Sequence, residues 1–212
     1  MSEYSIQDTT LSEIANAIRA KTGKNNAMTP LEMPSEIGSI SGGGGSGEII
    51  YFSLIPIMTS NTAPSGVASA SAAAYDCQPW CCMNGSPGTA AWHRWSGAFQ
   101  SGSTNYIQYR FSNSVYIDTL EIIPGGADVD IGDDCPCVIQ ASNDGTTFVD
   151  LGTFTILASQ DKTKINIPVN CHDTKYSYVR LVFNSWLQHS GSNHIIGLHK
   201  FQVYTKTVRV TS

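Results

Sequence analysis

The sequence predicts a mainly β protein, an antiparallel jelly-roll sandwich, with a small helical unit at its N-terminus. In residues 106–111 the side chains alternate between two faces, with the period of two that marks a half-buried strand. Residues 138–145 and 178–183 share this aromatic and β-branched character. A glycine-rich run at 41–47 separates these strands from the first forty residues.

The composition bounds the function. The 212 residues suffice for one sizeable β domain and something small. Charged residues make up 14%, the net charge is −5 and no basic run occurs, which argues against binding nucleic acid or an anionic membrane. No apolar run approaches the roughly 20 residues that span a bilayer. The start Met-Ser-Glu-Tyr shows no signal peptide, so we expect synthesis as a soluble cytoplasmic product.

The sequence predicts that residues 1–40 form a unit of two short helices. Thr10 and Glu13 make a capping box, and Leu11, Ile14 and Ile18 follow at helical spacing. A second helix starts at residues 29–32, with proline at its first position. So short a unit buries too little surface to be stable alone, so self-association or docking onto a partner should complete its core. Folding back onto the β domain is the alternative.

The composition of residues 41–47, Ser-Gly-Gly-Gly-Gly-Ser-Gly, predicts a flexible tether that reaches roughly 15 Å. An engineered linker has the same composition. As a natural segment, it separates an attachment end from a working end.

The β domain spans residues 48–206, and residues 207–212 are a tail. Residues 112–114 are turn-prone, and Asn143-Asp-Gly145 predicts a tight hairpin. A long irregular loop covers residues 75–97. The expected strands are residues 106–111, 116–123, 137–142, 148–155, 164–169, 178–184 and 197–205.

Four segments, in order, resemble the discoidin, or coagulation-factor C-type, domain: residues 105–111, 140–148, 178–181 and 196–204. This domain is a galactose-binding-like jelly roll that many carbohydrate-binding modules also use. The resemblance covers about three quarters of the chain and implies a ligand site in the loops at one end of the sandwich.

The N-terminal unit, with residues 17–23 and 33–37, is similar to the start of many phage and prophage tail-associated proteins. Together the two resemblances imply a virion protein with an attachment unit, a glycine tether and a glycan-recognising head.

The first candidate site lies in the loop from Trp80 to Trp95, which also holds His93 and Arg94. An aromatic ring can stack on the apolar face of a sugar, and Arg and His can bind its hydroxyls. Inward packing of Trp80 or Trp92 is the alternative. Trp92 occupies the position of the buried tryptophan in the domains it resembles, which favours Trp95 and Arg94 as contacts.

The second candidate site comprises Trp186, Gln188, His189 and His194 in the last long loop, which the resemblance places near the first. A solvated loop with Trp186 fixed to the core is the alternative. A metal site at the two histidines lacks a third ligand.

The sequence predicts no cofactor and no metal. Its cysteines are expected mostly as reduced, partly buried thiols, with zinc or one or two disulfides as alternatives. They are Cys77, Cys81, Cys82, Cys135, Cys137 and Cys171.

Calcium is disfavoured at two places. Relatives of the resembled type bind it through a Phe-Asp-Gly turn and a glutamate, whereas this chain has Met83-Asn84-Gly85 and Lys200. The acidic residues 127–134 lack the closing glutamate of a calcium loop and are expected as a solvated turn.

No nucleophile, metalloprotease or phosphate-binding motif is present, which argues against an enzyme. The sequence therefore predicts a non-enzymatic phage adhesin of a tail fibre, tail tip or baseplate. It would bind a host surface glycan, contact other virion proteins through residues 1–40 and self-associate, with a trimer favoured. The alternative is a structural capsid decoration or head-fibre protein. The glycan and a glycosidase-associated origin are left open.

Overall fold

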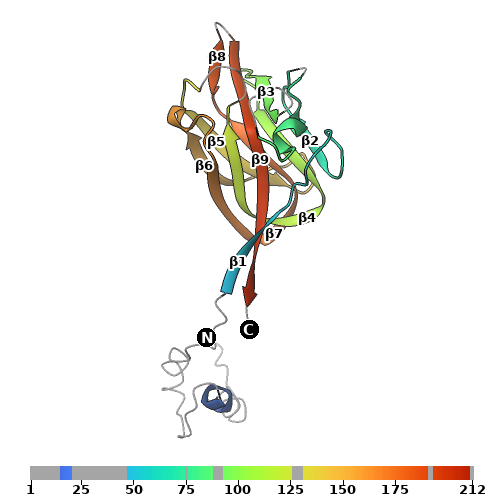
Figure 1. The fold of residues 1–212 in the computed structure, drawn as a ribbon, viewed down its shortest axis with the longest axis vertical. Coiled ribbons are helices and arrows are strands. Elements are labelled where there is room, and N and C mark those ends of the chain that lie inside the picture. The colour runs from blue at the N-terminus through green and yellow to red at the C-terminus, as the bar shows by residue number, and fades with distance from the viewer. Residues whose placement is uncertain are drawn as a thin grey trace, which may run out of the picture. The chain divides into compact units, whose positions relative to one another are not determined.

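The computed structural model describes residues 15–20, 47–74, 76–87, 93–125, 131–190 and 193–210 (Figure 1). The predicted fold class is confirmed, because these residues are mainly strands of one curled antiparallel sheet. Its strands and 3-10 helices are β1 (Gly47–Ser53), β2 (Val67–Ala70), η1 (Pro79–Met83), β3 (Trp95–Ala98), β4 (Asn105–Pro124), β5 (Cys135–Ser142), β6 (Val149–Ile156), η3 (Ala158–Gln160), β7 (Ile165–Phe183), β8 (Gln188–Ser190) and β9 (Asn193–Val210). No helix in the described ranges is long and apolar enough to cross a membrane.

The chain divides into two compact units, residues 51–207 and residues 1–50 with 208–212. In the smaller unit residues 15–20 are helical, as the helical spacing predicted, and Ala15 and Ile18 are buried. The predicted second helix and residues 41–46 of the tether lie outside the described residues. The division into a helical unit, a linker and a β domain therefore stays a prediction.

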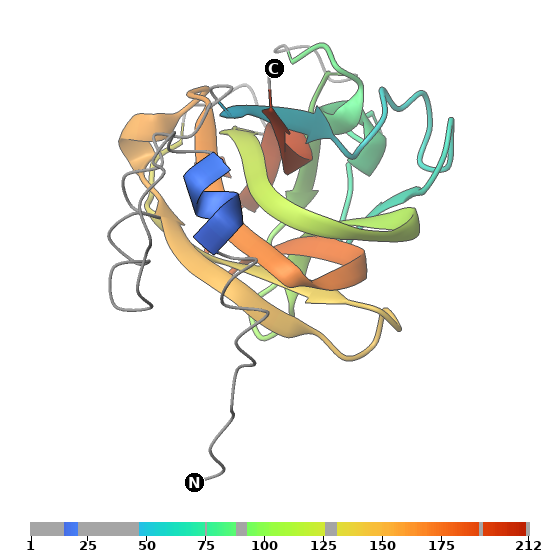
Figure 2. The same cartoon turned by 90° about the horizontal axis from the view of Figure 1, so that it is seen from below.

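The sheet order is β1-β9-β4-β7-β5-β6, with β2 beside β4 and with β3 and β8 beside β9. The first half of β4 pairs with β2 and with the second half of β7. The second half of β4 pairs with β9 and with the first half of β7. The long strands β4 and β7 therefore belong to both sets of pairings, and the sheet curls around a common interior (Figure 2).

The prediction of a turn at residues 112–114 is wrong. These residues continue β4, and the two strands expected at 164–169 and 178–184 are likewise parts of one strand, β7 (Ile165–Phe183). The pairing of β4 with β7 shifts register between Arg110 and Val115 instead of ending there. A bulge bends a strand while the ladder on either side persists, so pairing on both sides overrides the local turn preference.

The alternation that predicted the sandwich is confirmed in β4. Ile107, Tyr109 and Phe111 are buried, while Arg110 is exposed. The predicted hairpin at residues 143–145 joins the paired strands β5 and β6.

All six cysteines lie in the described ranges and are free; five are buried and Cys171 is partly exposed. Burial raises the pKa of the Cys82 and Cys137 thiols, which favours their protonated form at neutral pH. Cys135 and Cys137 lie side by side, with their sulfur atoms 3.8 Å apart.

Candidate functional site

An open pocket of about 480 Å³ lies where β3 and the start of β9 meet residues 72–74. β3 and β9 pair antiparallel, with Gly97 opposite Ile196. Residues 72–74 are fixed to β3 by two hydrogen bonds: Trp95 Nε1 donates to the Ala72 carbonyl (2.9 Å), and the Ala74 N–H donates to the Ser96 carbonyl (2.8 Å). The β3–β9 pairing and these two hydrogen bonds therefore hold the backbone walls of the pocket.

Gly97 is required by this close approach. A Cβ at this position would lie 2.5 Å from the Ala72 carbonyl oxygen, closer than real Cβ contacts allow. Any larger residue at 97 would push the 72–74 segment away from β3 and change the pocket.

Three aromatic side chains from three segments meet beside the pocket. His194, which is exposed at the start of β9, stacks on Trp186 with 3.9 Å between ring centroids and 22° between ring planes. Phe99, just after β3, meets Trp186 edge-on at 5.9 Å. Trp186 is held in turn by its Nε1, which donates to the Asp133 carboxylate at 2.9 Å.

Phe99, Asn193 and His194 line the pocket. The rings offer a flat apolar surface, and the imidazole and the amide offer hydrogen-bond donors and acceptors. This combination suits a ligand with one apolar face and several hydroxyl groups. No group of three His, Cys, Asp or Glu side chains suited to a metal occurs among the described residues.

The expected contact through Trp95 is wrong. Trp95 is 0% exposed and packs against Phe183 in the core, so its ring cannot reach a ligand. Arg94 is 8% exposed, and Trp80 packs partly buried against the core. His93 is half-buried and lies 3.3 Å from the Asn84 amide.

The prediction for the last long loop agrees better with the structure. Trp186 and His194, both predicted, are brought together in the aromatic stack. The predicted ligand contact through Gln188 is wrong, because this residue is 0% exposed and so cannot contact a ligand. The side chain of His189, like Trp92, lies outside the described residues. Phe99 and Asn193 were missed, since neither belongs to a motif and only the β3–β9 pairing places them at the pocket.

The residues at the calcium position of the resembled type do not suit calcium. Asn84, Gly85 and Lys200 line one small cavity, so the two departures seen in the sequence are neighbours in space. The Lys200 ammonium forms an ion pair with Glu121. The Asn84 side chain accepts a hydrogen bond from the Ser86 N–H at 2.9 Å. A cation brought here would be repelled by the ammonium.

The fold of the described residues is that of a discoidin-like β-sandwich. No protein-family model and no curated protein sequence matches the chain. Solved structures do share its fold. A truncated AlyQ with family 32 carbohydrate-binding and alginate lyase domains is 14% identical, with a TM-score of 0.54 over 75% of this chain. This chain spans 34% of that protein's length.

The family 32 carbohydrate-binding module of NanJ from C. perfringens, in complex with galactose, is 11% identical with a TM-score of 0.53. This similarity covers 74% of this chain and 100% of the module. A further family 32 module from Clostridium perfringens, in complex with GalNAc-β-1,3-galactose, is 16% identical with a TM-score of 0.52, over 66% of this chain and 95% of the module. These similarities establish the fold, and the discoidin-like domain expected from the sequence is confirmed at that level.

Proposed function

We propose that this chain is a non-catalytic glycan-binding protein whose pocket between β3 and β9 holds the sugar. The observation that carries the proposal is the stack of Trp186 on His194 beside Phe99, at the rim of an open pocket. Such a surface fits the apolar face of a pyranose, while His194 and Asn193 are placed to bind its hydroxyls. The sugars held by two modules of the same fold support this ligand class.

We further propose that the protein is a phage virion adhesin. The support is the similarity of residues 17–23 and 33–37 to tail-associated proteins, together with the glycine tether at 41–47. Attachment through residues 1–40 would leave the β domain free to bind a glycan on the host surface. Several copies would raise the avidity of a weak single site.

The test compares three single variants with the wild-type chain on a glycan array, followed by calorimetric titration of the best ligand. His194→Ala and Phe99→Ala remove parts of the binding surface and should weaken binding at least about tenfold, equivalent to about 1.4 kcal/mol. His93→Ala is the matched control, because this histidine lies outside the pocket and should leave affinity unchanged.

An array on which the wild-type chain binds no glycan would overturn the proposed function and favour the structural role in a virion. Equal affinities of wild type and His194→Ala would place the sugar elsewhere on the chain.

A further inference from the structure

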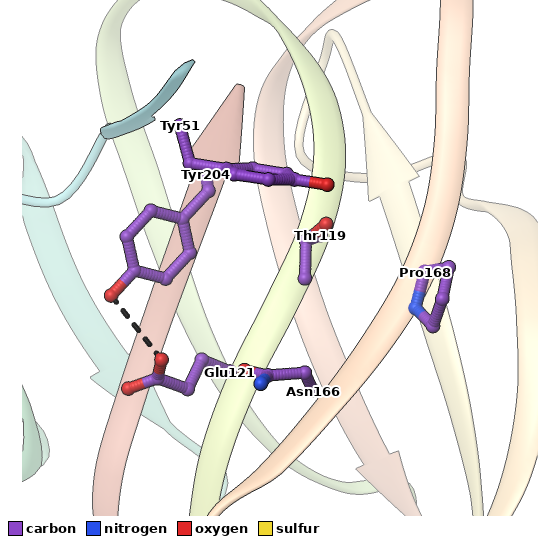
Figure 3. Close-up of a pocket in the computed structure, with 6 residues that line it drawn as sticks. All are labelled: Tyr51, Thr119, Glu121, Asn166, Pro168 and Tyr204. Atoms are coloured by element: carbon purple, nitrogen blue, oxygen red, sulfur yellow. Dashed lines mark hydrogen bonds between the residues drawn. The ribbon is translucent and has the colours of Figure 1, made fainter. Parts of the chain in front are cut away.

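A second depression lies on the outer face of the sheet, where β1, β9, β4 and β7 run beside one another (Figure 3). Its volume is about 380 Å³. Its lining consists of Tyr51, Thr119, Glu121, Asn166, Pro168 and Tyr204.

Strand register brings these side chains together. Thr119 on β4 stands between Tyr204 on β9 and Pro168 on β7. Two residues along, Glu121 stands opposite Asn166. In β4 the intervening Leu120 is fully buried, so Thr119 and Glu121 point away from the core, as the period of two requires.

Two tyrosine rings border the groove. Tyr51 is 53% exposed and Tyr204 is half-buried, and both line the groove together with Thr119 (Figure 3). The Tyr204 hydroxyl lies 3.5 Å from Glu121 Oε2. Burial, followed by the negative charge of Glu121, raises the pKa of Tyr204, so its hydroxyl remains protonated at neutral pH. Its proton is donated to Glu121, and its oxygen can accept a hydrogen bond from a ligand.

The carboxylate in the groove is already compensated. Glu121 is 6% exposed and forms ion pairs with Lys200 and, at 3.5 Å, with Lys164. The groove therefore does not need a cation to neutralise it. Its remaining polar groups, the Thr119 hydroxyl and the Asn166 amide, are uncharged.

We infer that this outer-face groove is a second saccharide site, which takes a neutral pyranose unit against the rings of Tyr51 and Tyr204. The volume falls in the range of small-molecule sites, about 300–1,000 Å³. The two rings supply apolar contact, the Thr119 hydroxyl and the Asn166 amide can donate and accept hydrogen bonds, and the Tyr204 oxygen can accept one. Rigid paired strands hold all of these groups, so little ordering is needed on binding.

This inference goes beyond the pocket between β3 and β9 and does not depend on it, since the two sites share no residue. Two sites on one chain would let it bind two branches or two chains of a surface polysaccharide. Simultaneous binding would raise avidity without any new contact at either site.

The test uses the full chain, an array of neutral and acidic oligosaccharides, and calorimetric titration of the strongest neutral ligand. The double variant Tyr51→Ala/Asn166→Ala removes a ring and an amide from the groove. The matched control is Tyr116→Ala/Asn113→Ala. It removes two exposed residues of the same types from β4, and neither residue lines the groove. Circular-dichroism melting of each variant shows whether it remains folded.

We expect two binding sites per chain in the wild type and the control. The Tyr51→Ala/Asn166→Ala variant should retain one site, which His194→Ala then removes. An unchanged number of sites in the folded groove variant overturns the inference, as does a wild-type chain with a single site that His194→Ala abolishes. Binding that only acidic saccharides show, or that only a protein partner shows, overturns the neutral-sugar assignment. If the groove variant keeps both sites, only the groove inference is overturned and the proposed pocket stands. If His194→Ala does not weaken binding, only the proposed pocket is overturned and the groove inference stands.

Discussion

At the scale of single residues, tryptophan shows what a sequence can and cannot say about a site. The sequence shows that three tryptophans lie in the loop at 80–95 and a fourth at position 186. It does not show which of them face solvent, because burial depends on strands that are distant in the sequence. Trp95 is covered because β3 pairs with β9 and Ala72 crosses beside it. No local pattern around Trp95 encodes either neighbour.

Asp144 yields a prediction about pH. The N–H groups of Thr147 and Thr146, each 2.7 Å from Oδ1, and the Ser142 hydroxyl lower the pKa of this carboxyl. A carboxyl whose pKa is lowered by folding adds stability above its unfolded pKa, about 4, and loses that contribution as pH falls toward the folded value.

The Asp144→Asn variant keeps the shape of the side chain and removes its charge. Wild type should therefore be the more stable protein at neutral pH, and its advantage should shrink below about pH 4. Urea denaturation of both proteins from neutral pH to about pH 3 measures the difference. A difference that stays constant over this range would contradict the assigned role.

At the scale of elements, the period of two was enough to find strands, and Asn143-Asp-Gly145 was enough to find a hairpin. Strand continuity was not predictable. The serine-rich residues 112–114 are locally turn-formers, and only pairing with β7 on both sides keeps them in β4. The order of strands in the sheet likewise depends on pairings between distant parts of the chain.

The turn before β2 gives a prediction with an internal control. Gly66 has φ +72°, and a Cβ there would lie 2.1 Å from the Tyr109 hydroxyl oxygen and 2.6 Å from the Arg110 carbonyl oxygen. The Tyr109 hydroxyl already donates to the Ser65 carbonyl at 2.6 Å, so it has little freedom to move. Gly102 has nearly the same φ, +76°, with nothing within 4 Å of its Cβ position.

Gly102→Ala should cost only the strain of a left-handed backbone, about 1–2 kcal/mol. Gly66→Ala adds a collision with backbone and a fixed phenol, so its loss should exceed about 3 kcal/mol. Chemical denaturation of both variants gives the comparison. Equal losses would show that the Ser65–Tyr109 contact yields easily.

At the scale of the whole molecule, a site lined by four strands is the hardest feature to foresee. Alternation says that Thr119 and Glu121 face outward, but it does not say which residues stand beside them. Tyr51 and Tyr204 reach the same groove from strands about 150 residues apart in the chain. The loop-end pocket was partly foreseen because the resemblance placed two loops at one end of the sandwich.

The last prediction concerns self-association through residues 1–40. The apolar residues of positions 1–40 are too few for a stable independent core, so self-association should complete it. Light scattering should then show an oligomer, with three copies favoured, for the full chain and a monomer for a chain lacking residues 1–47. Ile18→Asp in the full chain should also give a monomer, because Ile18 is 4% exposed within a single chain and a buried charge there would unfold the N-terminal unit. Both monomers should keep the affinity for a free sugar and lose the avidity for a glycan-coated surface. A truncated chain that stays oligomeric would move the association surface to the β domain.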